Sequence, residues 1–225
     1  MKEVLFLSGG GNETDSKQLD DKFVESMKER DGIGIAYIPV ALPVNQFAKA
    51  FEWFNSVFQN RAGKIEMWTE FKNKTKDDIS TISSIYVGGG DTVKLLNAFQ
   101  ESGFDNVLKA YIKDGGIVYG GSAGAIILGK DIRTAPEINK HQSESYSGLN
   151  VLEGYSIACH FMQEAVSHYQ DISRRIMSPI IALSERNGVR IIEANLEIVG
   201  SDSVSVIYPE SVKVIQPNEI LKLRI

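Results

Sequence analysis

The run Gly115-Gly116-Ile117-Val118-Tyr119-Gly120-Gly121-Ser122-Ala123-Gly124-Ala125-Ile126-Ile127-Leu128 joins two short apolar segments through a turn of glycines. The first segment, Ile117–Tyr119, has the length of a buried strand, and Ala123–Leu128 has the composition of a helix start. Strand, tight turn and helix in direct succession are typical of an α/β protein, in which functional groups follow the carboxyl ends of the strands. We therefore expect Ser122 to lie in such a turn.

The same alternation of elements precedes this run. The pattern predicts strands at Val4–Leu7, Ile33–Val40, Ile65–Trp68 and Ser83–Val87, and helices at Asp15–Glu29, Asn45–Asn60, Thr92–Ser102 and Asn106–Asp114. Strands separated by helices form right-handed βαβ units, so the fold class is α/β with a mostly parallel sheet and helices on both faces. The spacing of Phe47, Phe51, Phe54 and Phe58 predicts an aromatic stripe that faces the core.

The last third of the chain changes character. After a predicted helix near Asp171–Met177, short apolar runs follow one another closely, at Ile180–Leu183, Val189–Ile192, Leu196–Val199, Val204–Ile207 and Val212–Ile215. Turn residues separate these runs, which favours an antiparallel extension of the same sheet. No repeat or linker interrupts the pattern, so we expect one α/β domain over residues 1–225.

Composition excludes several classes of function. The 225 residues are 43% hydrophobic and 24% charged, with a formal net charge of −5 and scattered Lys and Arg, so nucleic acid is not an expected partner. No apolar stretch is long enough for a membrane span, and the short apolar start does not resemble a signal peptide. Cys159 is the one cysteine, which rules out an internal disulfide and a thiolate metal cluster and favours the cytoplasm.

The glycine turns Gly9–Gly11 and Gly88–Gly90 do not fit a nucleotide site. The dinucleotide fingerprint G-x-G-x-x-G fails because Thr14 and Val93 stand where the third glycine belongs, and no G-x-x-x-x-G-K-[ST] loop is present. Tight turns are a sufficient interpretation of these two triplets.

The third turn is more specific, because Gly120-Gly121-Ser122-Ala123-Gly124 fits the nucleophile-elbow pattern G-x-S-x-G. Small neighbours allow a strained turn to expose the serine hydroxyl, and the amide of Ala123 at a helix N-terminus then faces a developing oxyanion. On spacing alone, a serine that caps an ordinary helix explains the pattern equally well.

The blocks Val87–Thr92, Gly121–Ala125 and Cys159–Phe161 together resemble the peptidase E family of aspartyl dipeptidases, relatives of cyanophycinase. The resemblance extends from the first strand to about Val199. It implies an α/β fold like that of the class I glutamine amidotransferases and a Ser-His-Glu triad that needs no metal and no cofactor.

Carried over residue by residue, the resemblance makes Ser122 the nucleophile, His160 the base and Glu185 the acid that orients the base. His160 and Glu185 each follow an apolar run, so both are expected at the carboxyl ends of strands, near the catalytic crevice. His141 lies in a polar stretch that is typical of a loop.

The resemblance also implies binding residues. The backbone of Gly89 or Gly90 supplies the second oxyanion donor beside Ala123, and Glu137 binds the free α-amine of the substrate. At the position of the substrate-binding arginine of the family this chain has Ile172, which argues against strict aspartyl specificity.

Other chemistry for the same residues remains open at this point. His160, Glu164 and His168 recur every four residues, which would place them on one face of a helix, but the H-E-x-x-H pattern of a zinc site is absent. Cys159 is an alternative nucleophile, although strand neighbours point to opposite faces, so it should be buried if His160 faces the crevice.

Two further acids and two arginines have alternative interpretations. Glu193 and Glu197 are possible triad acids by composition but fit a solvated antiparallel edge better. Arg174 and Arg175 are expected to be solvated helix charges, with binding of a substrate carboxylate as the alternative for either.

Three functions remain in competition. The first is a serine dipeptidase acting on short peptides with a free N-terminus, including Asp-X; the second is a cyanophycinase-like hydrolase of a β-linked Asp-Arg polymer. The third is a non-catalytic binding protein on the same fold. The expected partner is a small peptide, and the expected state is a monomer or small homo-oligomer.

Overall fold

The computed structural model describes residues 2–28, 34–140 and 145–224, and in these ranges the strands form a sheet of eight and a sheet of four. The larger sheet, called the main sheet, has the strand order β12-β9-β8-β1-β5-β4-β2-β3. Its strands are β1 (Val4–Ser8), β2 (Gly34–Ile38), β3 (Lys64–Met67), β4 (Ser84–Val87), β5 (Ile117–Gly121), β8 (Asn187–Ile192), β9 (Asn195–Gly200) and β12 (Ile220–Lys222).

Strands β1 to β5 of the main sheet run parallel, and β8, β9 and β12 extend it antiparallel on the far side of β1. The fold is therefore α/β with a mainly parallel sheet flanked by helices, as the alternation of elements predicts. β5 lies at the centre, between β1 and β4. The turns that follow these three strands are the three glycine turns of the sequence, and parallel pairing brings them together at one edge.

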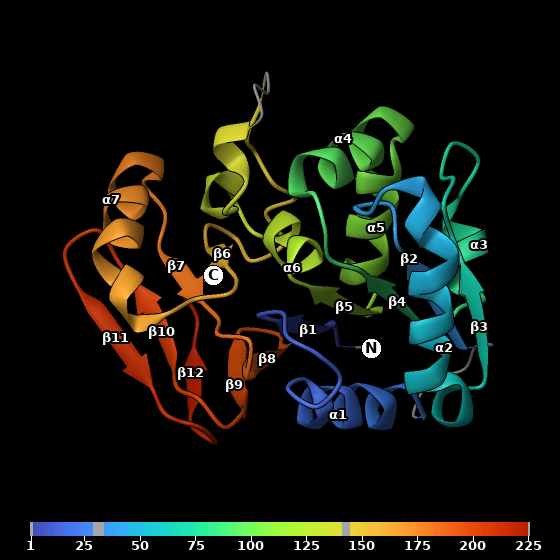
Figure 1. Ribbon diagram of the computed structural model, residues 1–225, viewed down its shortest axis with the longest axis horizontal. Helices are drawn as coiled ribbons and strands as arrows, with labels where there is room; N and C mark the ends of the chain where they lie inside the picture. The colour runs from blue at the N-terminus through green and yellow to red at the C-terminus, as the bar shows by residue number, and fades with distance from the viewer. Residues whose placement is uncertain (1, 29–33, 141–144, 225) are drawn as a thin grey trace.

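Alternating residues of the strands supply two cores, one on each face of the main sheet. In β1, Leu5 and Leu7 join the larger core, while Val4 and Phe6 face the opposite way into a second core. The larger core is covered by α3 (Lys76–Ser80), α4 (Thr92–Ser102), α5 (Phe104–Lys113) and α6 (Ala123–Leu128), and the second by α1 (Lys17–Lys28) and α2 (Phe47–Ala62). Figure 1 shows α4, α5 and α6 above the main sheet and α1 below it.

The aromatic stripe of α2 is confirmed for its last two members. Phe54 and Phe58 are fully buried in the second core, whereas Phe47 and Phe51 are only partly buried. The helix begins at Phe47 because a 3₁₀ turn, Val44–Gln46, follows Pro43. Glu29 and Ile33, the expected ends of the first helix and the second strand, lie outside the described residues.

The prediction of a single extended sheet is wrong for part of the last third. Strands β6 (Ser156–Ala158), β7 (Ile180–Ala182), β10 (Val204–Ile207) and β11 (Val212–Ile215) form a second sheet, in the order β11-β10-β7-β6. Strands β6 and β7 of this sheet pair in parallel. Helix α7 (Val166–Ile176) connects them and brings the chain back to the edge of the sheet where β6 starts. Helix α7 packs on this second sheet at the left of Figure 1.

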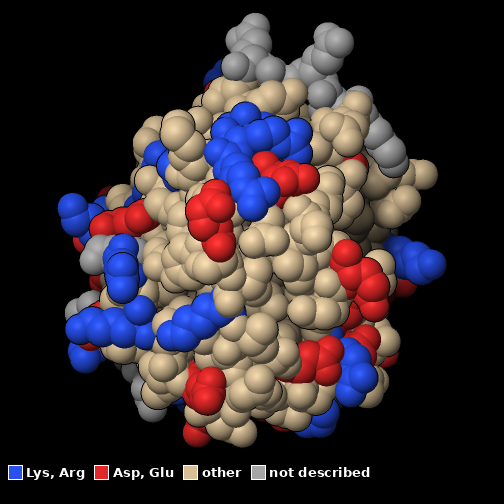
Figure 2. Space-filling view, turned by 90° about the vertical axis from the view of Figure 1, so that its left-hand side faces the viewer, with Lys and Arg blue, Asp and Glu red and all other residues tan. Residues whose placement is uncertain are grey.

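The surface on the side of α7 and β11 carries both signs of charge. Figure 2 shows Lys and Arg interspersed with Asp and Glu around an uncharged area, so this face has no continuous basic patch. Within the described ranges, no helix has the length and apolar character that crossing a lipid bilayer requires.

Candidate active site

Ser122 occupies a strained turn between β5 and α6. Its backbone angles are φ 49° and ψ −110°, a conformation that a non-glycine residue rarely adopts. In the described structure its side chain makes no capping hydrogen bond to α6, which argues against the helix-cap interpretation. The turn requires glycine at positions 120 and 124, because there is no room for a side chain. A Cβ at Gly124 would lie 2.2 Å from the carbonyl oxygen of Val87, and one at Gly120 would lie 2.7 Å from the amide nitrogen of Ala125.

His160 and Glu185 follow the carboxyl ends of β6 and β7, which are parallel neighbours in the second sheet with Ala158 opposite Ala182. The amide of His160 donates to the carbonyl of Gly9, 2.9 Å away, in the turn after β1. The second sheet therefore contacts the main sheet at the glycine turn that follows β1, and this contact positions His160 next to Ser122.

The three side chains form a continuous chain of polar contacts. Ser122 Oγ lies 2.8 Å from His160 Nε2, and His160 Nδ1 lies 2.8 Å from Glu185 Oε1. An ionised carboxylate only accepts, so the tautomer that satisfies both contacts has its proton on Nδ1 and leaves Nε2 free to accept the serine proton. The imidazole and carboxylate are 40% and 55% exposed, so solvent and substrate reach both.

The imidazole of His160 rests against Gly10, a contact that the sequence analysis missed. Gly10 has φ +115°, and a Cβ placed there would lie 2.3 Å from His160 Cε1. The neighbouring Gly9 is equally constrained, since its Cβ would lie 2.0 Å from the carbonyl oxygen of Ser184. Sequence reasoning interprets the triplet Gly9–Gly11 only as a tight turn. The sequence signal for its role is its position directly after the first strand, because the turns after parallel strands meet at the same edge of a sheet.

Ala123 and Gly89, two of the residues predicted to donate to an oxyanion, lie next to Ser122. Ala123 is the first residue of α6, so its N–H has no acceptor within that helix and lies at the positive end of the helix dipole. Between the two glycines considered as second donor, Gly89 lies against the serine, because its Cβ would be 3.2 Å from Ser122 Cβ. Gly90 (φ +136°) approaches Ala41 instead, where its Cβ would lie 2.6 Å from the carbonyl oxygen.

Glu137 is not among the residues that line the cleft at Ser122. Its Oε1 accepts the backbone N–H of Thr92 at 2.8 Å, which anchors the first turn of α4 just after the glycine turn Gly88–Gly90. The charge of this carboxylate is the second cause, after burial, of the raised pKa of the Cys159 thiol.

Cys159 is buried, as the alternation along a strand predicts. Its side chain is 0% exposed and its Sγ lies 3.5 Å from the carbonyl oxygen of Ser122, below the turn and not in the cleft. Burial, followed by the charge of Glu137, raises the pKa of the thiol far above its usual value. The thiol is therefore neutral and shielded, and it does not serve as the nucleophile.

The remaining alternatives separate in space. Glu164 lies in a 3₁₀ turn (Gln163–Ala165) and His168 in α7, so the two do not continue a helix with His160. Among the described residues no three His, Cys, Asp or Glu side chains form a group that could hold a metal ion. Glu193 forms an ion pair with Lys2, and Glu197 forms ion pairs with Lys22 and Arg190, so neither acid belongs to the relay. His141 lies outside the described residues.

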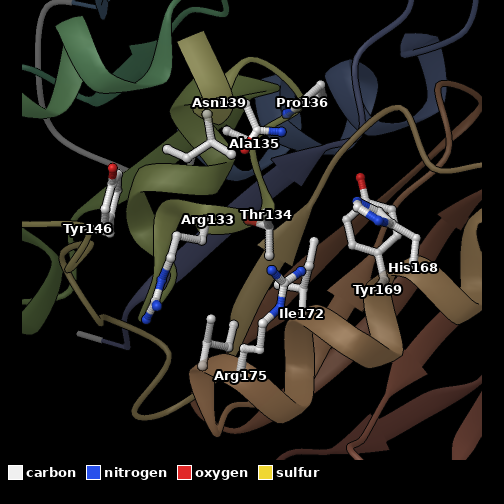
Figure 3. A pocket seen from close by; sticks show the side chains of 12 residues that line it. Arg133, Thr134, Ala135, Pro136, Asn139, Tyr146, His168, Tyr169, Ile172 and Arg175 are labelled. Atoms are coloured by element: carbon white, nitrogen blue, oxygen red, sulfur yellow. The ribbon is translucent and has the colours of Figure 1, made fainter. Parts of the chain in front are cut away.

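A cavity of about 490 Å³ lies between α7 and the segment of residues 133–139 (Figure 3). Ile172 lines it at the position where the resemblance places a substrate-binding arginine, and Arg175 lines it from the next turn of α7. Arg133 lines it too but donates from Nε to Asp131 Oδ1 and from Nη2 to Asp131 Oδ2, which forms a bidentate pair. Arg174 instead pairs with Asp171 and Glu210 at the surface, as expected of a solvated helix charge.

The cleft that contains Ser122 and His160 is smaller, at about 340 Å³. Its walls come from the three glycine turns and from β2, β4 and α2, and the lining residues are Ser8, Gly10, Gly11, Ser16, Tyr37, Leu42, Ala50, Trp53, Tyr86, Gly88, Gly89, Gly90, Gly121, Ser122 and His160. The nucleophile and the base therefore open onto a compact, largely uncharged space.

Comparisons with known proteins identify the family of this chain. The model of peptidase family S51 matches residues 4–199. The chain is 23% identical over 225 residues to a Peptidase E of Actinobacillus pleuropneumoniae (serotype 7), covering 91% of this chain and 92% of that protein. It is 32% identical over 130 residues to an uncharacterised peptidase, YgaJ, of Bacillus subtilis, a match that spans 56% of each chain.

Solved structures share the fold. A peptidase from an acI-B1 actinobacterium superposes with a TM-score of 0.78 at 17% identity, covering 99% of this chain and 98% of that chain. A putative Peptidase E of Listeria monocytogenes EGD-e superposes with a TM-score of 0.64 at 19% identity, covering 96% and 99%.

Proposed function

This chain belongs to peptidase family S51 and is a serine peptidase, and we propose that it hydrolyses short peptides with a free N-terminus through a Ser122-His160-Glu185 relay. The observation that carries the proposal is the pair of 2.8 Å contacts that link the hydroxyl, the imidazole and the carboxylate. The strained backbone of Ser122 supports it as well, because strain of this kind is typical of a nucleophile elbow.

The proposed reaction has two halves. Ser122 Oγ attacks the scissile carbonyl carbon while His160 Nε2 takes the hydroxyl proton; the imidazolium then gives that proton to the amine nitrogen as the C–N bond breaks. Water attacks the acyl-enzyme and gives a proton to Nε2; the imidazolium then returns that proton to Oγ as the C–Oγ bond breaks, which releases the acid and restores the serine. Glu185 stabilises the imidazolium in both halves, and the amides of Ala123 and Gly89 stabilise the oxyanion.

The direct test is covalent labelling. A fluorophosphonate is expected to label the native protein at one site, and Ser122→Ala is expected to remain unlabelled, because the probe reacts only with an activated serine. The modified peptide is identified by mass spectrometry. An unlabelled native protein, or a Ser122→Ala protein that is still labelled, would show that this serine is not an activated nucleophile.

Recognition of the free N-terminus is a separate part of the proposal, and Glu137 carries it. Glu137 does not line the cleft at Ser122, but one of its carboxylate oxygens accepts the Thr92 amide beside the glycine turn Gly88–Gly90, and the proposal assigns the other oxygen to the substrate ammonium. In Glu137→Gln the amide oxygen still accepts from Thr92, but the charge is lost. We expect a roughly tenfold or larger fall in kcat/KM for a free dipeptide amide and little change for its N-acetylated form. Equal, unchanged cleavage of both substrates in the variant contradicts this role.

A cytoplasmic location belongs to the proposal as well. It is supported by the single cysteine, which is buried and free, since disulfides are typical of oxidising compartments.

A further inference from the structure

We propose that the cleft at Ser122 receives an uncharged apolar or aromatic side chain of the substrate and discriminates against a carboxylate side chain. This inference rests on the proposed function and assigns the substrate class of the same site. The observations that carry it are the chemistry of the cleft walls, their rigidity and the charges at the rim.

The inner wall is aromatic and held in place. Tyr37 stacks on Phe54 with ring centroids 4.1 Å apart, and Tyr86 stacks on Tyr119 at 4.3 Å. Both lining tyrosines are buried, and burial raises the pKa of Tyr37 to about 12, so its hydroxyl stays neutral at physiological pH. A wall that is part of the packed core does not reorganise on binding, which favours a substrate group that gains from apolar contact.

The outer wall is apolar too. Trp53 of α2 is 39% exposed and lines the cleft together with Leu42 and Ala50. An exposed tryptophan at the mouth of a cavity offers a large area to an apolar or aromatic group of a ligand.

The charges around the cleft oppose an anion. Among the lining residues, all in the described part of the chain, none is a lysine or arginine. The cation beside the wall, Lys94, donates to the carbonyl of Leu42. At the rim, Glu13 accepts the indole N–H of Trp53 at 3.2 Å, and its own backbone amide and this indole lower the pKa of its carboxyl. Glu13 is therefore ionised, and Glu185 lies behind His160.

The contrast with the cavity at α7 strengthens this assignment. Arg133 and Arg175 line that cavity, whereas no lysine or arginine is among the described residues that line the cleft at the nucleophile (Figure 3). A buried acidic group is best stabilised by a cation that replaces its water, and within the described ranges no lysine or arginine is among the residues that line the cleft at Ser122, where the donors are hydroxyls and backbone amides.

The test compares two series of unblocked dipeptides, Xaa-Ala and Ala-Xaa, with Phe, Leu, Asp or Lys at the varied position. We expect one series, the one whose varied residue enters the cleft, to show kcat/KM for Phe or Leu at least about tenfold above that for Asp and Lys. In Trp53→Arg the apolar wall is lost and Glu13 gains a cationic partner, so the Phe-to-Asp ratio in that series should fall about tenfold or more. The matched control is Val214→Arg on β11, which adds the same charge at a position 44% exposed and outside the cleft, and should leave the ratio unchanged.

The inference is overturned if neither series favours Phe or Leu over both Asp and Lys, or if Trp53→Arg leaves the ratio unchanged. Fluorophosphonate labelling of the same preparations distinguishes a failure of this inference from a failure of the proposed function. A labelled Ser122 combined with a preference for Asp contradicts the inference alone, whereas an unlabelled native protein contradicts the proposed function itself.

Discussion

Ser122→Ala is expected to lower kcat for peptide hydrolysis by about 10⁴- to 10⁶-fold, while the protein folds normally. The hydroxyl makes its contact with His160 and no capping bond to α6 in the described structure, so its removal takes away the nucleophile and little else. His160→Ala should cost about as much, and the double variant should be no worse than either single one, because residues of one relay act as a unit. Glu185→Gln keeps a hydrogen-bonding side chain but loses the charge, and a smaller loss is expected.

The measurement is kcat on a cleaved dipeptide, with far-UV circular dichroism and the melting temperature as checks of the fold. Ser211→Ala provides a control, since Ser211 is an exposed serine in the turn between β10 and β11, remote from the cleft. Substantial residual turnover in Ser122→Ala, with the fold intact, would show that another group attacks the substrate.

Gly10→Ala is expected to reduce kcat by about 10²-fold or more, although position 10 makes no contribution to the chemistry. The new Cβ would lie 2.3 Å from His160 Cε1, a distance that forces the imidazole away from Ser122. Displacement of a catalytic group by about 1 Å is enough to cost a factor of this size.

Gly154→Ala is the matched control for backbone strain. Gly154 has φ +109°, close to the +115° of Gly10, but a Cβ there would meet nothing within 4 Å. Both variants should therefore lose roughly 1 kcal/mol of stability from the positive φ, and only Gly10→Ala should lose activity. If the two variants fall in activity by the same factor, the cause is general destabilisation and Gly10 does not position His160.

Much of the fold was predictable because it depends on local pattern. Ile117–Tyr119, the glycines and Ala123–Leu128 identify a strand, a turn and a helix, and the helix bounds agree with the structure. Strands separated by helices predict a sheet with two covered faces, and the continuous apolar run of β1 supplies residues to both cores. Parallel βαβ units bring the glycine turns to one edge. The elbow at Ser122 follows from small residues at fixed spacing, a requirement that holds within five residues of chain.

The second sheet could not be derived in this way. Ile180–Leu183 and Val204–Ile207 are apolar runs that suit any buried strand, and periodicity carries no information about the partner with which a strand pairs. Pairing of β7 with β6 depends on α7 returning the chain to the same edge, which is a property of packing.

The sequence by itself therefore determined the parallel half of the main sheet, the glycine turn that holds Ser122 and the residue types of a relay. The backbone angles of Ser122 in the structure decided between a strained elbow and a helix cap. Only the tertiary structure decided that His160 and Glu185 come from a different sheet than Ser122, and that Gly9 and Gly10 allow the two sheets to meet closely enough for a 2.8 Å contact. The physical reason is that neighbouring residues encode the geometry of a strand or a turn. The close approach of two sheets depends instead on residues far apart in the chain, and here it requires glycines, which have no side chain, at the point of contact.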